Sequence, residues 1–209
     1  MNEPLAQRLR PKTLADVCGQ QHLLAPGRVF RRTIESGRIP NMIFYGPSGT
    51  GKTTVARLLA QIYRAVGVPS KGQLVEVDRS GLVAGYVGQT ALKTQEAVQK
   101  ALGGVLFIEE AYALVNQDSA TDFGREAIEV LLKNMEDHRD DLIVIVAGYT
   151  NLMEKFIHSN PGLESRFNKY FYFEDYTAPQ LLEIFQSMCN RGGYTLSTEG
   201  EDAARKLLD

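Results

Sequence analysis

Residues 46–53 combine glycines, a lysine and a threonine in a spacing suited to holding a polyphosphate. The segment reads Gly-Pro-Ser-Gly-Thr-Gly-Lys-Thr and fits the pattern G-x-x-x-x-G-K-[ST] between an apolar run and a helical pattern. Its glycines allow a curled backbone whose N–H groups point inward, and the start of the helix adds partial positive charge at the same place. We expect Lys52 to reach the β- and γ-phosphates of a nucleotide and the Thr53 hydroxyl to bind Mg²⁺. A glycine-rich turn that binds nothing is the alternative. The expected nucleotide contacts are Gly46, Pro47, Ser48, Gly49, Thr50, Gly51, Lys52, Thr53 and Thr54.

Two carboxylates follow directly on a second apolar run. Residues 103–110 read Gly-Gly-Val-Leu-Phe-Ile-Glu-Glu, so Glu109 and Glu110 stand at the carboxyl end of an expected strand. Ligands bind at this end of the strands in open α/β sheets. We expect Glu109 to face Mg²⁺ through its water shell and Glu110 to orient and polarise the water that attacks the γ-phosphate. The alternative is a pair of solvated loop residues.

The elements that must position these residues alternate along the chain. Alternating strands and helices are typical of a parallel sheet covered on both faces, and continuous apolar runs are typical of its buried strands. The pattern after residue 175 is wholly helical. We expect strands at 42–45, 74–77, 105–108, 142–147 and 170–173, and helices at 52–66, 89–102, 125–137, 179–191 and 199–208. The expected organisation is an N-terminal segment at 1–40, an α/β nucleotide-binding core at 41–175 and a partial helical lid at 176–209.

Composition excludes several classes of protein. A chain of 209 residues with 44% hydrophobic content forms one medium domain, alone or with a small appendage, and is no peptide hormone, disordered tail or disulfide-stapled miniprotein. The net charge of −2 gives no global field for nucleic acid. However, residues 1–57 carry nine of the 23 basic and three of the 25 acidic side chains, so this part could contact an anion.

The cysteines and the apolar runs bear on location. Cys18 and Cys189 lack metal spacing, and a reduced cytosolic setting is the simplest interpretation. The first residues lack the apolar core of a signal peptide, and the longest apolar run, 142–147, is too short to span a bilayer. We therefore expect a soluble, cytoplasmic protein without a membrane partner.

Several sequence blocks resemble the AAA+ ATPases over nearly the whole chain. From about residue 43 to 176, the likeness is to the stage V sporulation protein K group and the CbbX-type Rubisco activases. The blocks are Leu-Val-Glu-Val-Asp-Arg at 74–79, Gly-Tyr-Val-Gly-Gln-Thr-Ala at 85–91, Phe-Ile-Glu-Glu-Ala-Tyr at 107–112 and Asn-Pro-Gly-Leu-Glu-Ser-Arg-Phe at 160–167. The resemblance implies a P-loop NTPase of the AAA+ type, with a five-stranded parallel sheet sandwiched by helices and a small helical lid. It also implies ATP or ADP with Mg²⁺ as cofactors, and a ring oligomer that is a hexamer when complete.

Residues 4–40 resemble a different branch, the clamp-loader-like replication-associated recombination ATPases. The blocks are Pro-Leu-Ala-Gln-Arg-Leu-Arg-Pro-Lys-Thr-Leu at 4–14 and Gly-Gln-Gln-His-Leu-Leu at 19–24. The chain thus resembles a chimera of two AAA+ relatives, of natural or engineered origin, joined near the phosphate loop. The superfamily lines its adenine pocket with this region, which implies that Val17 and Gly19 pack the base. An ordinary loop that enters a helix is the alternative.

The resemblance also assigns roles outside the phosphate loop. Tyr86 and Val87, between flanking glycines, match an aromatic pore loop that grips a polypeptide client, although a core or strand-edge position would explain them too. Arg166 matches the arginine finger that acts on a neighbouring subunit, and its alternative is a structural arginine that caps a helix or pairs with a glutamate. Thr150, after the fourth expected strand, is our choice for the sensor 1 position.

The chain departs from the family pattern in two places. The family usually has Asp where Glu109 stands, and the extra methylene moves the carboxylate about 1.5 Å further where Mg²⁺ demands near-ideal geometry, so turnover is expected to be weak. The sequence also ends before the helix that usually carries a sensor 2 arginine, and the setting of Arg205 does not match that role.

Three functions follow as hypotheses. The leading one is a Mg-ATP-dependent ATPase whose ring couples hydrolysis to remodelling or threading of a protein client. The rival is a DNA-metabolism ATPase of the clamp-loader or recombination type, which would bind DNA. The third is a truncated or hybrid domain that binds nucleotide and has little activity.

Overall fold

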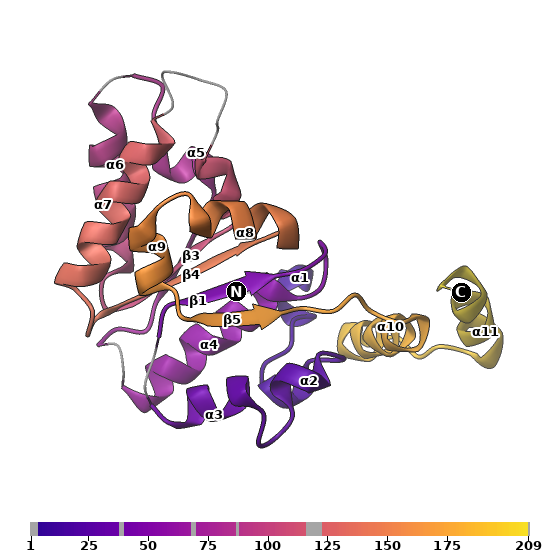
Figure 1. Cartoon of the computed structure of the whole chain (residues 1–209). Coiled ribbons are helices and arrows are strands. Elements are labelled where there is room, and N and C mark those ends of the chain that lie inside the picture. Colours follow the sequence, from indigo (N-terminus) through magenta and orange to yellow (C-terminus); the bar gives the residue numbers. More distant parts are fainter. Residues whose placement is uncertain (1–3, 38–39, 68–69, 87, 116–122, 209) are drawn as a thin grey trace.

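A five-stranded parallel sheet forms the centre of the molecule (Figure 1). The computed structural model describes residues 4–37, 40–67, 70–86, 88–115 and 123–208. The strand order is β2-β3-β4-β1-β5, and every pairing is parallel. The strands are β1 (Met42–Tyr45), β2 (Leu74–Val77), β3 (Gly104–Ile108), β4 (Leu142–Gly148) and β5 (Lys169–Tyr172). The expected five-stranded parallel sheet is confirmed.

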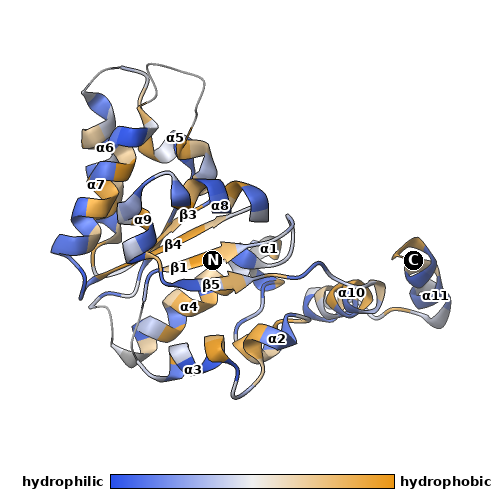
Figure 2. Ribbon diagram, viewed as in Figure 1, coloured by the Kyte–Doolittle hydropathy of each residue, from blue (hydrophilic) through white to orange (hydrophobic). Residues whose placement is uncertain are grey.

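Helices cover both faces of this sheet (Figure 1). Residues of β3 and β4 are all buried and point alternately into two apolar clusters, one on each face. This two-sided burial explains why both strands are continuous apolar runs. The first face is covered by α6 (Gln89–Ala101), α7 (Gly124–Asp137), α8 (Thr150–His158) and α9 (Pro161–Arg166), and the second by α2 (Gln21–Leu24), α3 (Val29–Glu35) and α4 (Lys52–Val66). Figure 2 shows the same layering, with hydrophobic strands between helices of mixed character.

The register of the strands brings three strand ends to one edge of the sheet. Tyr45 of β1 pairs with Gly148 of β4, and Ile108 of β3 pairs with Val146 of β4. The segments that leave these three strands therefore start side by side.

Two helices complete the chain beyond β5. These are α10 (Ala178–Gly192) and α11 (Thr198–Leu208), which project away from the sheet (Figure 1). The side chain of Arg191 on α10 ties this part to the N-terminal segment by donating to the carbonyls of Leu9 at 3.2 Å and Asp16 at 3.5 Å. The remaining elements are α1 (Leu5–Arg8), α5 (Arg79–Leu82) and the 3₁₀ turns η1 (Leu14–Asp16) and η2 (Ala111–Leu114).

Most predicted elements agree with the structure to within one residue at each end. The short helices α1, α2, α3 and α5 were not predicted. Two more helices, α8 and α9, lie between β4 and β5 and were not predicted either. Both carried a usable signal: Met153, Phe156 and Ile157 are buried at helical spacing, and Asn160 caps α9 before a proline. In the described part of the chain, no helix combines the length and apolar character needed to cross a membrane.

Candidate functional site

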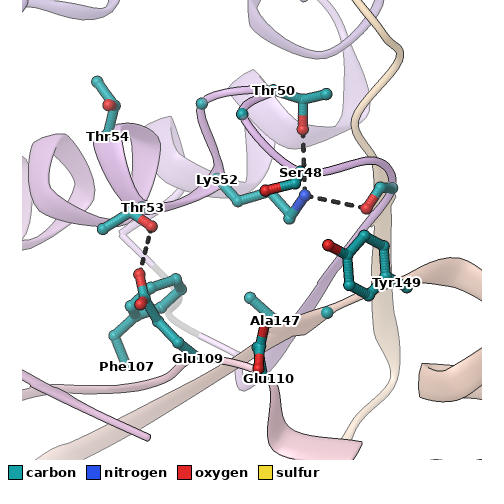
Figure 3. Close-up of a pocket in the computed structure, with 14 residues that line it drawn as sticks. Ser48, Thr50, Lys52, Thr53, Thr54, Phe107, Glu109, Glu110, Ala147 and Tyr149 are labelled. Atoms are coloured by element: carbon teal, nitrogen blue, oxygen red, sulfur yellow. Dashed lines mark hydrogen bonds between the residues drawn. The ribbon is translucent and has the colours of Figure 1, made fainter.

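A cavity of about 290 Å³ lies at the sheet edge where β1, β3 and β4 end (Figure 3). The loop after β1 forms one wall, and residues at and just after the carboxyl ends of β3 and β4 form the other. The lining residues are Gly46, Ser48, Gly49, Thr50, Gly51, Lys52, Thr53, Thr54, Phe107, Glu109, Glu110, Ala147, Gly148 and Tyr149. The structure therefore brings the predicted loop, except Pro47, together with both predicted acids.

Backbone geometry explains the glycines of this loop. Gly46, Gly49 and Gly51 all have positive φ, at 142°, 77° and 91°. A Cβ atom at Gly46 would lie 2.2 Å from the carbonyl oxygen of Phe173, a distance no side chain tolerates. The loop can therefore turn back against the strand end only with glycine at this position.

The ammonium of Lys52 lies inside the loop. Its Nζ donates to the carbonyl of Gly46 at 3.0 Å, the hydroxyl of Thr50 at 3.2 Å and the carbonyl of Pro47. Burial lowers the pKa of Lys52. All of its bonded acceptors in the described structure are neutral, so its charge is free to attract an anion in the cavity.

Thr53 and Glu109 meet across the cavity. The Thr53 hydroxyl donates to a Glu109 carboxylate oxygen at 2.6 Å (Figure 3). The longer side chain of glutamate is thus used to reach the first turn of α4. Hydroxyl and carboxylate oxygens are hard donors that suit Mg²⁺, which takes few protein ligands beside the phosphates. Thr53 and Glu109 therefore fit a magnesium ion that is also bound by phosphates. In the described part of the chain, no group of three or more His, Cys, Asp or Glu side chains is placed to hold a metal ion without such a ligand.

Glu110 reaches the same cavity through an unusual backbone conformation. Its φ of 49° and ψ of 43° lie in the left-handed region, and its side chain is exposed at the cavity wall. The hydroxyl of Tyr112 lies beside it: burial, followed by the charge and the acceptor oxygens of Glu110, raises the pKa of Tyr112. A non-glycine residue held at positive φ is often part of a functional site.

The residues after β4 line different cavities. Thr150, the first residue of α8, does not line this cavity. It lines a separate hollow of about 210 Å³ beside Ile43 and Met153. Tyr149 lines the cavity instead, with its ring 6.0 Å from that of Tyr112. Its place two residues after the apolar run 142–147 was the available signal.

A second cavity of about 520 Å³ adjoins the first. The two share Gly49, Gly51 and Thr54. Val17 lines the second cavity, as expected for a base-packing residue. Gly19 does not line this cavity, but it lies against Tyr176, which does. A Cβ atom at Gly19 would approach the Tyr176 ring to 2.7 Å. An apolar wall that was not predicted comes from α10 and the segment before it and consists of Tyr176, Ile184 and Met188.

Two further predicted residues, Arg166 and Tyr86, line neither cavity. Arg166, at the end of α9, contacts the Glu136 carboxylate at 3.6 Å and the Ser165 hydroxyl at 3.3 Å. Tyr86 is 73% exposed. Val87 lies outside the described residues.

Comparison with known proteins identifies a family. Residues 42–175 match the family described as "ATPase family associated with various cellular activities (AAA)". Protein CfxQ of Xanthobacter flavus is 50% identical over 168 residues, which cover 80% of this chain and 53% of that protein.

Two further relatives carry the names of the groups that residues 43–176 resemble. Stage V sporulation protein K of Bacillus subtilis is 48% identical over 161 residues, covering 77% of this chain and 50% of its own. The chloroplastic ribulose bisphosphate carboxylase/oxygenase activase of Cyanidioschyzon merolae is 48% identical over 161 residues, with coverages of 77% and 55%. The chain thus spans about half the length of the curated relatives it matches.

A solved structure supports the fold. A point variant of RuvB from Thermotoga maritima superposes with a TM-score of 0.64 at 23% identity, covering 95% of this chain and 59% of its own. At this identity, the likeness concerns the fold alone.

Proposed function

The chain belongs to the ATPase family associated with various cellular activities, and from this premise we propose that it binds Mg-ATP at the edge of its sheet and hydrolyses it. One observation carries the proposal. Lys52, the bonded pair of Thr53 and Glu109, and Glu110 all line one cavity although they follow two different strands. A glycine-rich turn that binds nothing would not require two carboxylates, Glu109 and Glu110, in the same cavity.

The chemistry divides among these residues. Backbone N–H groups of the loop and the Lys52 ammonium hold the phosphates. Thr53 and Glu109 would hold Mg²⁺, whose contribution is to neutralise charge on the β- and γ-phosphates. Glu110 orients and polarises the attacking water, and its exposed carboxylate at the cavity wall supports this role.

The adjoining cavity suits the nucleoside. Val17, Ile184 and Met188 offer apolar surface, and the shared residues Gly49 and Gly51 connect this cavity to the phosphate site. We place adenine there, packed between the N-terminal segment and α10. This placement supports the proposed division into an N-terminal segment at 1–40, a core at 41–175 and a helical lid from 176 onward.

Hydrolysis in this proposal needs a second copy of the chain. Arg166 lines neither cavity of its own chain. In a ring, proposed to be a hexamer, Arg166 would reach the γ-phosphate of the neighbouring subunit and stabilise charge during phosphoryl transfer.

We propose that ATP hydrolysis drives the remodelling or threading of a protein client. One relative is named as an activase of another enzyme, which makes a folded protein the client class to test first. Tyr86 projects a broad aromatic surface that can grip a chain of any sequence.

Two measurements test this function. The rate of phosphate release per chain should rise with protein concentration, and a slowly hydrolysed ATP analogue should raise the mass in solution. Tyr86→Ala should abolish client-stimulated hydrolysis and leave ADP affinity unchanged, whereas Tyr170→Phe, a change on the edge strand β5, should alter neither. A monomer at all concentrations with full activity would refute the ring. A monomer with little activity would favour the third hypothesis, a nucleotide-binding domain.

One observation favours the DNA-metabolism alternative. Arg10, Lys12 and Arg57 line a hollow of about 370 Å³ beside α4. Arg57 is already paired with Glu76, which leaves two cations for an anion. The chimera interpretation assigns residues 4–40, which include Arg10 and Lys12, to the recombination-type ATPases. DNA binding that weakens steeply between two salt concentrations, measured by fluorescence anisotropy, would support this alternative.

A further inference from the structure

The Thr50 carbonyl receives hydrogen bonds from two side chains that the proposed mechanism does not use. Gln20 donates through Nε2 at 3.2 Å, and Tyr176 donates through its hydroxyl at 3.1 Å. One donor lies in the N-terminal segment and the other between β5 and α10. Two distant parts of the chain therefore hold the same peptide group of the phosphate loop.

The peptide bond between Thr50 and Gly51 is rigid, so the bonds to the Thr50 carbonyl also affect the N–H of Gly51. In a trans peptide the N–H of the next residue points opposite to the carbonyl. Holding the carbonyl of Thr50 therefore also sets the direction of the Gly51 N–H. Gly51 lines both cavities, and within the described residues its N–H donates to no acceptor. An N–H fixed in this way is ready to bind an anion.

Gln20 is held firmly enough to act in this way. It is 4% exposed and has a left-handed backbone with φ of 52°. Its amide nitrogen also donates to the Glu174 carbonyl at 2.8 Å, and its amide oxygen accepts from the Glu174 N–H at 3.2 Å. Each end of the amide is therefore bonded, and the side chain cannot rotate without losing hydrogen bonds.

Tyr176 is confined by two glycines. A Cβ atom at Gly51 would lie 2.9 Å from its hydroxyl, and one at Gly19 would lie 2.7 Å from its ring. Tyr176 lies two residues before the start of α10, so a movement of α10 would displace it directly.

We propose that Gln20 and Tyr176 are positioning residues of the phosphate loop, which aim the Gly51 N–H at the phosphates of a bound nucleotide and couple the loop to α10. This inference rests on the proposed nucleotide binding. It assigns the two residues to the phosphates, although Tyr176 lines the cavity proposed for the base.

The test compares ADP with adenosine, which lacks the phosphates. Tyr176→Phe removes one hydroxyl and keeps the ring between the glycines. We expect its dissociation constant for ADP to rise about three- to tenfold, the usual effect of one hydrogen bond. Adenosine affinity, measured by competition with a fluorescent ADP analogue, should stay within about twofold, because no phosphate contact is involved. Tyr172→Phe is the matched control and should leave both affinities unchanged.

The outcomes separate this inference from the proposed function. Wild-type protein that binds no ADP would refute both. Wild-type protein that binds ADP and a Tyr176→Phe variant that binds equally well would refute only the positioning role. Equal weakening of ADP and adenosine would assign Tyr176 to the base and would also overturn the inference. Gln20→Met, of similar volume but without hydrogen bonds, should repeat the selective loss. If that variant does not fold, the result for Tyr176→Phe decides.

Discussion

The guanidinium of Arg166 lies 3.6 Å from the carboxylate of Glu136, which joins α9 to α7 within one chain. The two side chains are 27% and 52% exposed, and Glu136 also pairs with Arg139. A partly exposed pair of this kind contributes about 0–1 kcal/mol to stability. Arg166 can therefore leave Glu136 at little cost in free energy, as the proposed action on a neighbouring subunit requires.

Substitutions of Arg166 and of Glu136 should have different effects on the rate of ATP hydrolysis. Arg166→Ala should lower the rate of ATP hydrolysis by about 10³-fold and leave ADP affinity unchanged, because in the proposed ring the arginine acts only on the transition state in a neighbouring subunit. Glu136→Gln removes the same ion pair from the other side and should change the rate by less than about twofold. Phosphate release measured at saturating ATP distinguishes them.

Mixing two inactive variants tests the action across subunits. A chain with Arg166→Ala keeps its own cavity, and a chain with Glu110→Gln keeps its Arg166. Mixed rings should therefore regain activity above either variant alone. Mixtures as inactive as their components would argue that Arg166 acts in some other way.

Glu110→Gln is expected to separate binding from chemistry. The amide keeps the size of the side chain and its left-handed backbone but cannot polarise water as the carboxylate does, so hydrolysis should fall by about 10²- to 10⁴-fold. ATP affinity should stay within about twofold of wild type. Glu129→Gln, an exposed glutamate on α7, is the control and should hydrolyse normally. Hydrolysis by Glu110→Gln at the wild-type rate would assign the water to another residue.

Lys52 predicts a pH dependence of nucleotide binding. Burial lowers the pKa of Lys52, so in the nucleotide-free protein its proton leaves at a lower pH than that of an exposed lysine. Phosphates bind the ammonium form, and ADP affinity should therefore fall as the pH rises through the lowered pKa, by up to about tenfold per pH unit. The stability of the nucleotide-free protein moves the other way: the buried charge destabilises it below the folded pKa, and this effect disappears as the pH rises toward the unfolded pKa.

Isothermal titration of ADP from neutral to alkaline pH measures this effect. Lys52→Arg remains charged throughout and should bind more weakly but with a flatter pH profile. Equal slopes for wild type and Lys52→Arg would show that other groups cause the dependence.

Local sequence patterns were enough to predict the loop, both acids and all five strands. Residues 46–54 act through a backbone shape that their own glycines permit, and the strands follow from apolar runs buried on both faces. In contrast, Gln20 bonds to Glu174, a residue 154 positions away, and no periodicity indicates such a contact. The helix α8 was not predicted either, and with it went unpredicted that Tyr149 lines the cavity while Thr150, the first residue of α8, lines a separate one.

Glu109 offers the sharpest test of the metal site. Glu109→Gln keeps the length that lets the side chain reach Thr53 but removes the negative charge, so Mg²⁺ should bind the nucleotide complex about 10- to 100-fold more weakly. Without Mg²⁺, ADP should bind with nearly unchanged affinity, because the loop and Lys52 hold the phosphates. Glu109→Asp introduces the residue that the family usually has at this position. It keeps the negative charge, but the shorter side chain loses the 2.6 Å hydrogen bond to Thr53. If the extra methylene limits turnover, this variant should hydrolyse ATP faster than wild type at saturating Mg²⁺. A slower variant would show instead that α4 and β3 are spaced for glutamate in this chain.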